Sequence, residues 1–151
     1  MRRPRRIPPV LLAATFTLLM WIASTVTPKL NISLPRVTLA FVLADAALIV
    51  TALAVHEFRE QRTSVNPLDL TRTSAVVTTG IYRASRNPMY LAMLLGLLAF
   101  GCFLSNPISV GIAVLFVPTI TRFQIIPEER VLSSRFGSAY TTYCATVRRW
   151  I

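Results

Sequence analysis

Residues 87–123 read NPMYLAMLLGLLAFGCFLSNPISVGIAVLFVPTITRF, two apolar runs that each begin with the dipeptide Asn-Pro. Asparagine favours the position before a helix, and proline fits the first helical turn, where its missing N–H costs no hydrogen bond. The runs therefore predict two helices, over residues 88–104 and 107–123. Because only two residues separate these runs, we expect a tight antiparallel hairpin. Pro118 lies inside the second run and predicts a kink, since proline cannot donate to the carbonyl four residues earlier.

Two further apolar runs precede the hairpin. Residues 10–27 contain no charged side chain, and residues 37–55 contain one, Asp45. At ~1.5 Å per helical residue, such runs approach the thickness of the hydrocarbon core, about 30 Å. The chain is 54% hydrophobic and only 15% charged, whereas soluble domains carry about 25% charged residues. The sequence therefore predicts an all-α integral membrane bundle of about four transmembrane helices, in a single domain over residues 1–151.

The first apolar run has an alternative interpretation. The basic segment MRRPRR before it is also typical of the start of a secretory signal peptide. We favour an uncleaved first span, because the run is long and three more apolar segments follow it.

The basic residues indicate how such a bundle is oriented. Most of the 16 Lys and Arg residues lie in the N-terminus, in the loop over residues 56–87 and after residue 121, whereas the loop between the first two runs holds Lys29 and Arg36. The positive-inside rule then places the 56–87 loop and both termini in the cytoplasm. Arginines at helix ends that face anionic lipid account for the net charge of +10. No basic stripe interleaved with aromatic residues indicates nucleic-acid binding.

The polar tail predicts two short helices that close the cytoplasmic end. Pro127 marks the start of the first, with Glu128 and Glu129 in its first turn, where unpaired N–H groups and the helix dipole favour carboxylates. Gly137 marks its end. On spacing alone, the two glutamates are equally well explained as a helix-start signal. The second helix is predicted to lie at the membrane interface, with an aromatic face and neighbouring arginines, and its apolar residues are Tyr140, Tyr143, Val147 and Trp150.

Three motifs in this order carry a resemblance. They are GIYRASRNPMY at 80–90, the SNP turn at 105–107 and PEERVLSSRFGSAYTTY at 127–143. Together they resemble the isoprenylcysteine carboxyl methyltransferase family, to which the phospholipid N-methyltransferases are related. That family has Gly-x-Tyr, Arg-His-Pro-x-Tyr, a membrane hairpin, and then Glu-Glu with Phe-Gly-x-x-Tyr. The spacing matches without gaps from about residue 67 to residue 143, and the chain is similar to the small bacterial branch of the family.

The resemblance implies a membrane-embedded methyltransferase that binds S-adenosylmethionine between segments 67–90 and 122–143, at the mouth of the hairpin. Its acceptor would be a lipophilic or lipid-linked molecule that enters from the membrane lipids, and no metal is implied. Gln124 occupies the family's acceptor-binding position. The arrangement requires Tyr82, Tyr90 and Glu128 to converge around one cavity. The full set of implied cofactor contacts is Ser74, Ala75, Val76, Val77, Tyr82, Asn87, Pro88, Met89, Tyr90 and Glu128.

Two positions depart from the family pattern. Asn87 stands where the family has histidine, and because an amide carries no proton at neutral pH we assign it to binding rather than to base catalysis. Gln124 stands where the family has an arginine that meets a substrate carboxylate, and glutamine is neutral. Three alternatives therefore stay open: methyl transfer to a phospholipid or small amine, methyl transfer to a thiol, and a non-catalytic membrane scaffold.

Four other residues with reactive or ionisable side chains lie outside these motifs. Asp45, near the middle of the second span, costs roughly 2.5–3.5 kcal/mol on insertion scales and is a functional candidate by default. His56 is predicted to be an interfacial residue, and Cys102 and Cys144 form neither a disulfide pattern nor a metal motif. For Asp45 we favour a structural role, in which it is protonated or hydrogen-bonds to threonines and joins two helices; the candidates are Thr15, Thr17 and Thr38.

Overall fold

The computed structural model describes residues 8–60 and 77–151, and within these ranges the chain is helical and contains no strand. The predicted all-α class is confirmed. The elements are α1 (Pro9–Val26), α2 (Leu34–Glu60), the 3-10 turn η2 (Gly80–Arg83), α3 (Pro88–Phe103), α4 (Pro107–Ile120), the π-helical turn η3 (Thr121–Ile125), α5 (Ile126–Phe136) and α6 (Ser138–Thr146).

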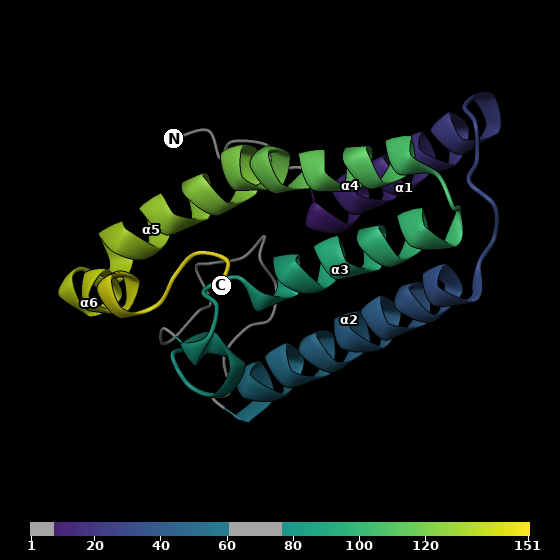
Figure 1. Cartoon of the computed structure of the whole chain (residues 1–151). Helices are drawn as coiled ribbons and strands as arrows, with labels where there is room; N and C mark the ends of the chain where they lie inside the picture. The colour runs from purple at the N-terminus through teal and green to yellow at the C-terminus, as the bar shows by residue number, and fades with distance from the viewer. Residues whose placement is uncertain (1–7, 61–76) are drawn as a thin grey trace.

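The α3–α4 hairpin lies at the centre of the bundle. Helix α2 packs along α3, and α1 packs along α4, so that α3 lies between α2 and the α1–α4 pair (Figure 1). From α1 to α4, each helix runs opposite to the one before it, and α5 continues from the end of α4 (Figure 1). The end of α2, the start of α3, η2, α5 and α6 therefore gather at the same end of the bundle (Figure 1). This arrangement places the two polar segments of the chain together.

Three helices are long and apolar enough to cross a membrane: α1, α2 and the continuous helix Pro107–Phe136. Helix α3 is apolar but has only 16 residues, so its role as a fourth span stays a prediction. The observed bounds lie close to the expected ones for α1 and α3. Helix α2 is longer than the apolar run that predicted it, because it begins at Leu34, before the run, and continues into polar residues as far as Glu60.

The expected break between the fourth span and the tail is wrong. The helix instead runs from Pro107 to Phe136 without interruption, and Figure 1 shows it changing direction around η3. Here the N–H of Ile126 bonds to the carbonyl of Thr121, five residues earlier. A π-turn is a known way for a helix to accommodate a proline that cannot donate, and Pro127 follows directly. Glu128 and Glu129 consequently lie within a continuing helix, and the unpaired N–H groups expected to favour them are absent there.

The hairpin turn is held by Asn106, which caps α4 as predicted. Its Oδ1 accepts from the N–H of Ser109 at 2.9 Å. Its Nδ2 donates to Thr27 Oγ1 at 2.7 Å and to the Pro28 carbonyl at 3.2 Å. The side chain is almost fully buried, with 1% of its surface exposed. One amide therefore starts α4 and ties the turn to the end of α1.

Replacing this amide tests the tie. Asn106→Ala removes a helix cap, worth about 1 kcal/mol, and leaves the Thr27 hydroxyl without its donor. We expect the apparent Tm in detergent to fall by about 2–8 °C. The matched control is Asn31→Ala, since Asn31 is exposed, and its Tm should equal that of the parent. Equal unfolding temperatures for both variants would contradict this role of Asn106.

Candidate functional site

A buried hydrogen bond joins the two motif segments at the end of the bundle. The hydroxyl of Tyr90, in the first turn of α3, donates to Glu128 Oε1 of α5 at 2.8 Å. Tyr90 is 6% exposed and Glu128 9% exposed. A buried carboxylate needs such donors, because leaving it without them costs several kcal/mol. The pair therefore fixes α5 against the start of α3.

The helix that carries Glu128 presents further polar groups to the interior. Gln124 lies one turn earlier, within η3, and is only 2% exposed. The hydroxyl of Thr121 is also buried, and it makes no hydrogen bond within the part of the chain that the structure describes. Polar side chains thus line the inner face of a helix that is otherwise apolar. A site for a ligand with polar groups would be built in this way.

Tyr82 lies in a neighbouring apolar cluster. It packs with Ala54 of α2 and with Val77, and the ring of Phe58 meets its ring edge-on at 5.4 Å. Its carbonyl accepts a hydrogen bond from the hydroxyl of Tyr143 at 2.6 Å. Burial is the main cause that raises the pKa of Tyr82, and the neighbouring Tyr143 adds to it. Burial of Tyr143 likewise raises its pKa, to about 12, against the opposing effect of Arg86. Both phenols therefore stay neutral at physiological pH.

The structure brings some of the expected cofactor contacts together and leaves others apart. Tyr90 belongs to the core cluster between α3 and α4, whereas Tyr82, Val77 and Met89 belong to the cluster against α2. Convergence of Tyr82, Tyr90 and Glu128 around one cavity stays a prediction. A cleft of about 450 Å³ does lie beside η2 and α6, but its lining residues are others: Thr78, Arg83, Ala139, Thr142, Tyr143, Thr146 and Val147. Three of the expected contacts lie outside the described residues, namely Ser74, Ala75 and Val76.

Asn87 precedes α3, but its side chain does not cap that helix, contrary to the expectation. Its Nδ2 instead donates to the carbonyl of Arg149 at 3.0 Å, and its backbone N–H donates to Ser85 Oγ at 3.1 Å. The reason is that the C-terminal segment brings a carbonyl to this point. Pro88, next along the chain, is fully buried. Asn87 therefore holds the end of the chain against the start of α3.

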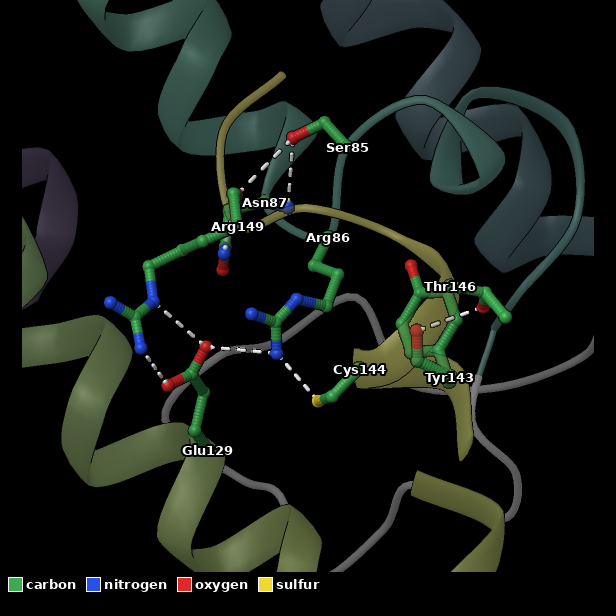
Figure 2. A network of polar contacts seen from close by, with 8 residues as sticks. All are labelled: Ser85, Arg86, Asn87, Glu129, Tyr143, Cys144, Thr146 and Arg149. Atoms are coloured by element: carbon green, nitrogen blue, oxygen red, sulfur yellow. Dashed lines mark hydrogen bonds and ion pairs between the residues drawn. The ribbon is translucent and has the colours of Figure 1, made fainter. Parts of the chain in front are cut away.

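A network of charged groups, which the sequence did not reveal, surrounds this contact (Figure 2). Glu129 accepts two hydrogen bonds from Arg149, at 3.0 and 2.7 Å. It also pairs with Arg86 Nη1 at 3.2 Å, and the same Nη1 lies 2.5 Å from Cys144 Sγ. The hydrogen bonds to Glu129 are the main cause that raises the pKa of the Arg149 guanidinium. Such paired, charge-assisted bonds fix orientation as well as adding energy, so Glu129 holds three segments in place.

Comparisons with known proteins show the family to which the chain belongs. Residues 35–139, more than half of the chain, match the family described as phospholipid methyltransferase. The chain belongs to the phospholipid methyltransferase family. It is also 43% identical over 63 residues to an uncharacterized protein of Haemophilus influenzae, an alignment that covers 42% of this chain and all of that protein. No solved structure matches the chain.

Family membership confirms the resemblance drawn from the motifs and identifies the chain as a relative of membrane methyltransferases. The matched residues include η2, α3 and α5, and with them both members of the Tyr90–Glu128 pair. Arg86 and Glu129 also lie within the match, whereas Cys144 and Arg149 follow it. The network of Figure 2 therefore joins residues of the matched region to the last residues of the chain.

The aromatic residues of the tail do not form the expected interfacial helix. Helix α6 ends at Thr146, and Tyr140 and Tyr143 are buried, at 4% and 7% exposure. Beyond α6 the chain turns back, the Arg148 carbonyl accepts from the Arg86 N–H at 3.0 Å, and Trp150 packs against the core cluster that contains Tyr90. The aromatic side chains of the tail therefore pack inside the protein instead of lying at the membrane interface. The Arg-Arg-Trp segment at residues 148–150 indicates an anchor, but its spacing does not distinguish contact with lipid from contact with protein.

The network predicts how the C-terminal segment is held. Glu129→Gln removes the charge that Arg86 and Arg149 share, so we expect the segment to loosen. The readout is the fluorescence of Trp150. It is measured in a Trp21→Phe background, in which Trp150 is the sole tryptophan. The emission should shift to the red, and the C-terminus should be cleaved faster by a protease. Glu60→Gln serves as the control for loss of an exposed carboxylate, and identical spectra for both variants would refute this role of Glu129.

Proposed function

We propose that the chain is an S-adenosylmethionine-dependent methyltransferase that acts on a lipophilic or lipid-linked acceptor. The observation that carries the proposal is the buried contact between Tyr90 and Glu128. It joins the first turn of α3 to α5, the two segments that the resemblance assigns to the cofactor, in a chain of the phospholipid methyltransferase family.

The residues present fit the chemistry of this cofactor. Its cationic and hydroxyl groups suit the carboxylate of Glu128, since charged acceptors make the stronger hydrogen bonds. Its carboxylate suits Arg86, whose Nε is buried and makes no hydrogen bond within residues 8–60 and 77–151. S-adenosylmethionine supplies a methyl group bonded to a positively charged sulfur, and this sulfur is a good leaving group. The protein then mainly has to align donor and acceptor and exclude water, and positioning of this kind contributes about 7–11 kcal/mol.

The distribution of charge supports a site on the cytoplasmic side. Arginines gather at the end of the bundle where η2, α5 and α6 lie, whereas Lys29 and Arg36 follow α1 at the opposite end. By the positive-inside rule the arginine-rich end faces the cytoplasm, and both termini with it. The polar cofactor would then enter from the cytosol, and a lipophilic acceptor would enter from the bilayer.

The proposal that the protein binds S-adenosylmethionine is tested at the buried Tyr90–Glu128 pair. Tyr90→Phe removes the donor of the hydrogen bond, whereas Glu128→Gln keeps an oxygen acceptor and removes the negative charge. Because a hydrogen bond to a charged group contributes about 1.5–3 kcal/mol, Glu128→Gln should weaken S-adenosylmethionine binding by about tenfold or more. Tyr90→Phe should weaken it less. Binding is measured by calorimetry in detergent, with Glu60→Gln as the control.

Two outcomes would count against this proposal. Unchanged affinity in folded Glu128→Gln would remove Glu128 from the cofactor site. Absence of any binding by the folded parent would favour the alternative that the chain is a non-catalytic membrane scaffold.

Gln124 indicates which chemical group accepts the methyl. The resemblance places a cation here to meet a substrate carboxylate, but the side chain is a neutral, buried amide. This favours an amine over a carboxylate as the acceptor, as in methylation of an amine-bearing phospholipid, and the family description is consistent with it. In such a step a nitrogen lone pair forms the new bond to the methyl carbon, the carbon–sulfur bond breaks with its electrons on sulfur, and a proton leaves the nitrogen for water.

Gln124→Arg tests this assignment. The variant and the parent are each given methyl-labelled S-adenosylmethionine with a total membrane lipid extract, and the labelled products are identified. We expect the parent to label an amine-bearing lipid. The new cation should lower that labelling by about tenfold, because a buried like charge disfavours an amine that becomes cationic. If product and rate were the same in both, Gln124 would not face the acceptor.

A further inference from the structure

Helix α2 is covered on one side only. Helix α2 packs against α3 and η2, and its two buried residues are Ala40 and Ala54, the latter in the cluster with Val77 and Tyr82. The opposite side is open and carries large apolar side chains, among them Val42 at 57% and Ile49 at 60% exposure. Since α2 is long and apolar enough to cross a membrane, this open side is the one that would meet lipid or another protein.

Asp45 lies in the middle of that open side. It is exposed, and it makes no hydrogen bond or ion pair within the described residues. The expected bond to threonines of the first span is not formed with Thr15 or Thr17, whose hydroxyls donate to carbonyls of their own helix, those of Leu11 and Ala13. Ionisable residues inside membranes almost always face the protein interior or pair with one another. A carboxyl that faces hydrocarbon is therefore an unsatisfied position.

The residues around Asp45 form a regular seam. They recur at alternating intervals of four and three, which is the 3.5-residue period of two helices that pack along each other. Over the first five positions, the branched aliphatic side chains of Val42 and Ile49 alternate with the small or polar ones of Thr38, Asp45 and Ala52. Small residues allow two helices in a bilayer to approach closely, and branched residues at the alternate positions favour a pair. All six positions are exposed: Thr38, Val42, Asp45, Ile49, Ala52 and His56.

We propose that this seam binds the same seam of a second copy of the chain, so that the protein is a homodimer joined through α2. Copies of one membrane protein insert with the same orientation, so a two-fold axis lies along the membrane normal and the two α2 helices run parallel. Each seam residue then meets its own counterpart, and Asp45 meets Asp45 of the other copy.

The carboxyl is what makes the surface self-complementary. A protonated carboxyl both donates and accepts, so two of them satisfy each other at a depth where water is absent. One polar residue in an apolar seam also fixes the register of the pair. Lipid offers no such partner, and no described segment of the same chain reaches Asp45. A second copy would cover the open side of α2 and would also give the Asp45 carboxyl a partner, with residues that the chain already carries.

Disulfide crosslinking in native membranes tests the interface. Val42→Cys and Ile49→Cys lie on the seam, and Leu39→Cys is the control, since Leu39 is 49% exposed at a similar depth on another side of α2. The parent chain gives the background from its two native cysteines. After mild oxidation, we expect covalent dimers for the two seam variants well above both controls. Equal yields at Leu39 and Ile49, no dimer above the parent, or a crosslink to a different protein would each overturn the proposal.

Substitutions at Asp45 test its part in the interface, in the Ile49→Cys background. Asp45→Asn retains a donor and an acceptor and should keep the dimer yield. Asp45→Leu should weaken association by about three- to fifteenfold, the range expected for an interhelical hydrogen bond in a bilayer. Helix content measured by circular dichroism separates this loss from misfolding. An unchanged yield in Asp45→Leu would remove Asp45 from the interface, and the crosslinks of the Val42→Cys and Ile49→Cys variants stand independently of it.

Discussion

The need to satisfy a carboxylate inside a mostly apolar bundle is the constraint on which the site depends. Glu128 is buried, and the hydroxyl of Tyr90 meets it from a helix that begins 40 residues earlier in the chain. In water such a bond contributes little, but in a medium of low dielectric an unmet carboxylate is costly. The bond therefore sets how α5 continues from the membrane helix and where it meets α3. The polar inner face of that helix, including Gln124, is positioned by the same contact.

Around this pair, the end of the bundle is assembled from distant segments by a few side chains that each make several bonds. Asn106 starts one helix and binds the end of another. Glu129 holds Arg86 from the middle of the chain and Arg149 from its C-terminal segment, and Asn87 holds the returning C-terminus. A site built in this way is rigid without a large polar core, which suits a protein that aligns two reactants rather than one that supplies a base.

The sequence predicted the elements of the fold better than the contacts between them. Asn-Pro pairs and apolar runs indicate helices through local chemistry, and this reasoning succeeded for the hairpin and for the cap at Asn106. It failed at Asn87, which has the same local signal but meets a carbonyl from the end of the chain. At Pro127 it placed the start of α5 within one residue, but it missed the π-turn that joins α5 to the membrane helix without a break. The depth of Asp45 was evident from its run, but the side of α2 it occupies depends on packing against α3, which spacing does not encode.

The central claim is that S-adenosylmethionine binds where α3 meets α5, beside Tyr90 and Glu128. The most direct measurement is photolabelling of the purified protein with radiolabelled S-adenosylmethionine, followed by peptide mapping. The account predicts label on peptides from residues 80–90 and 122–136, and competition by unlabelled cofactor. Label confined to the cleft residues of α6, or spread over the apolar helices without competition, would contradict it.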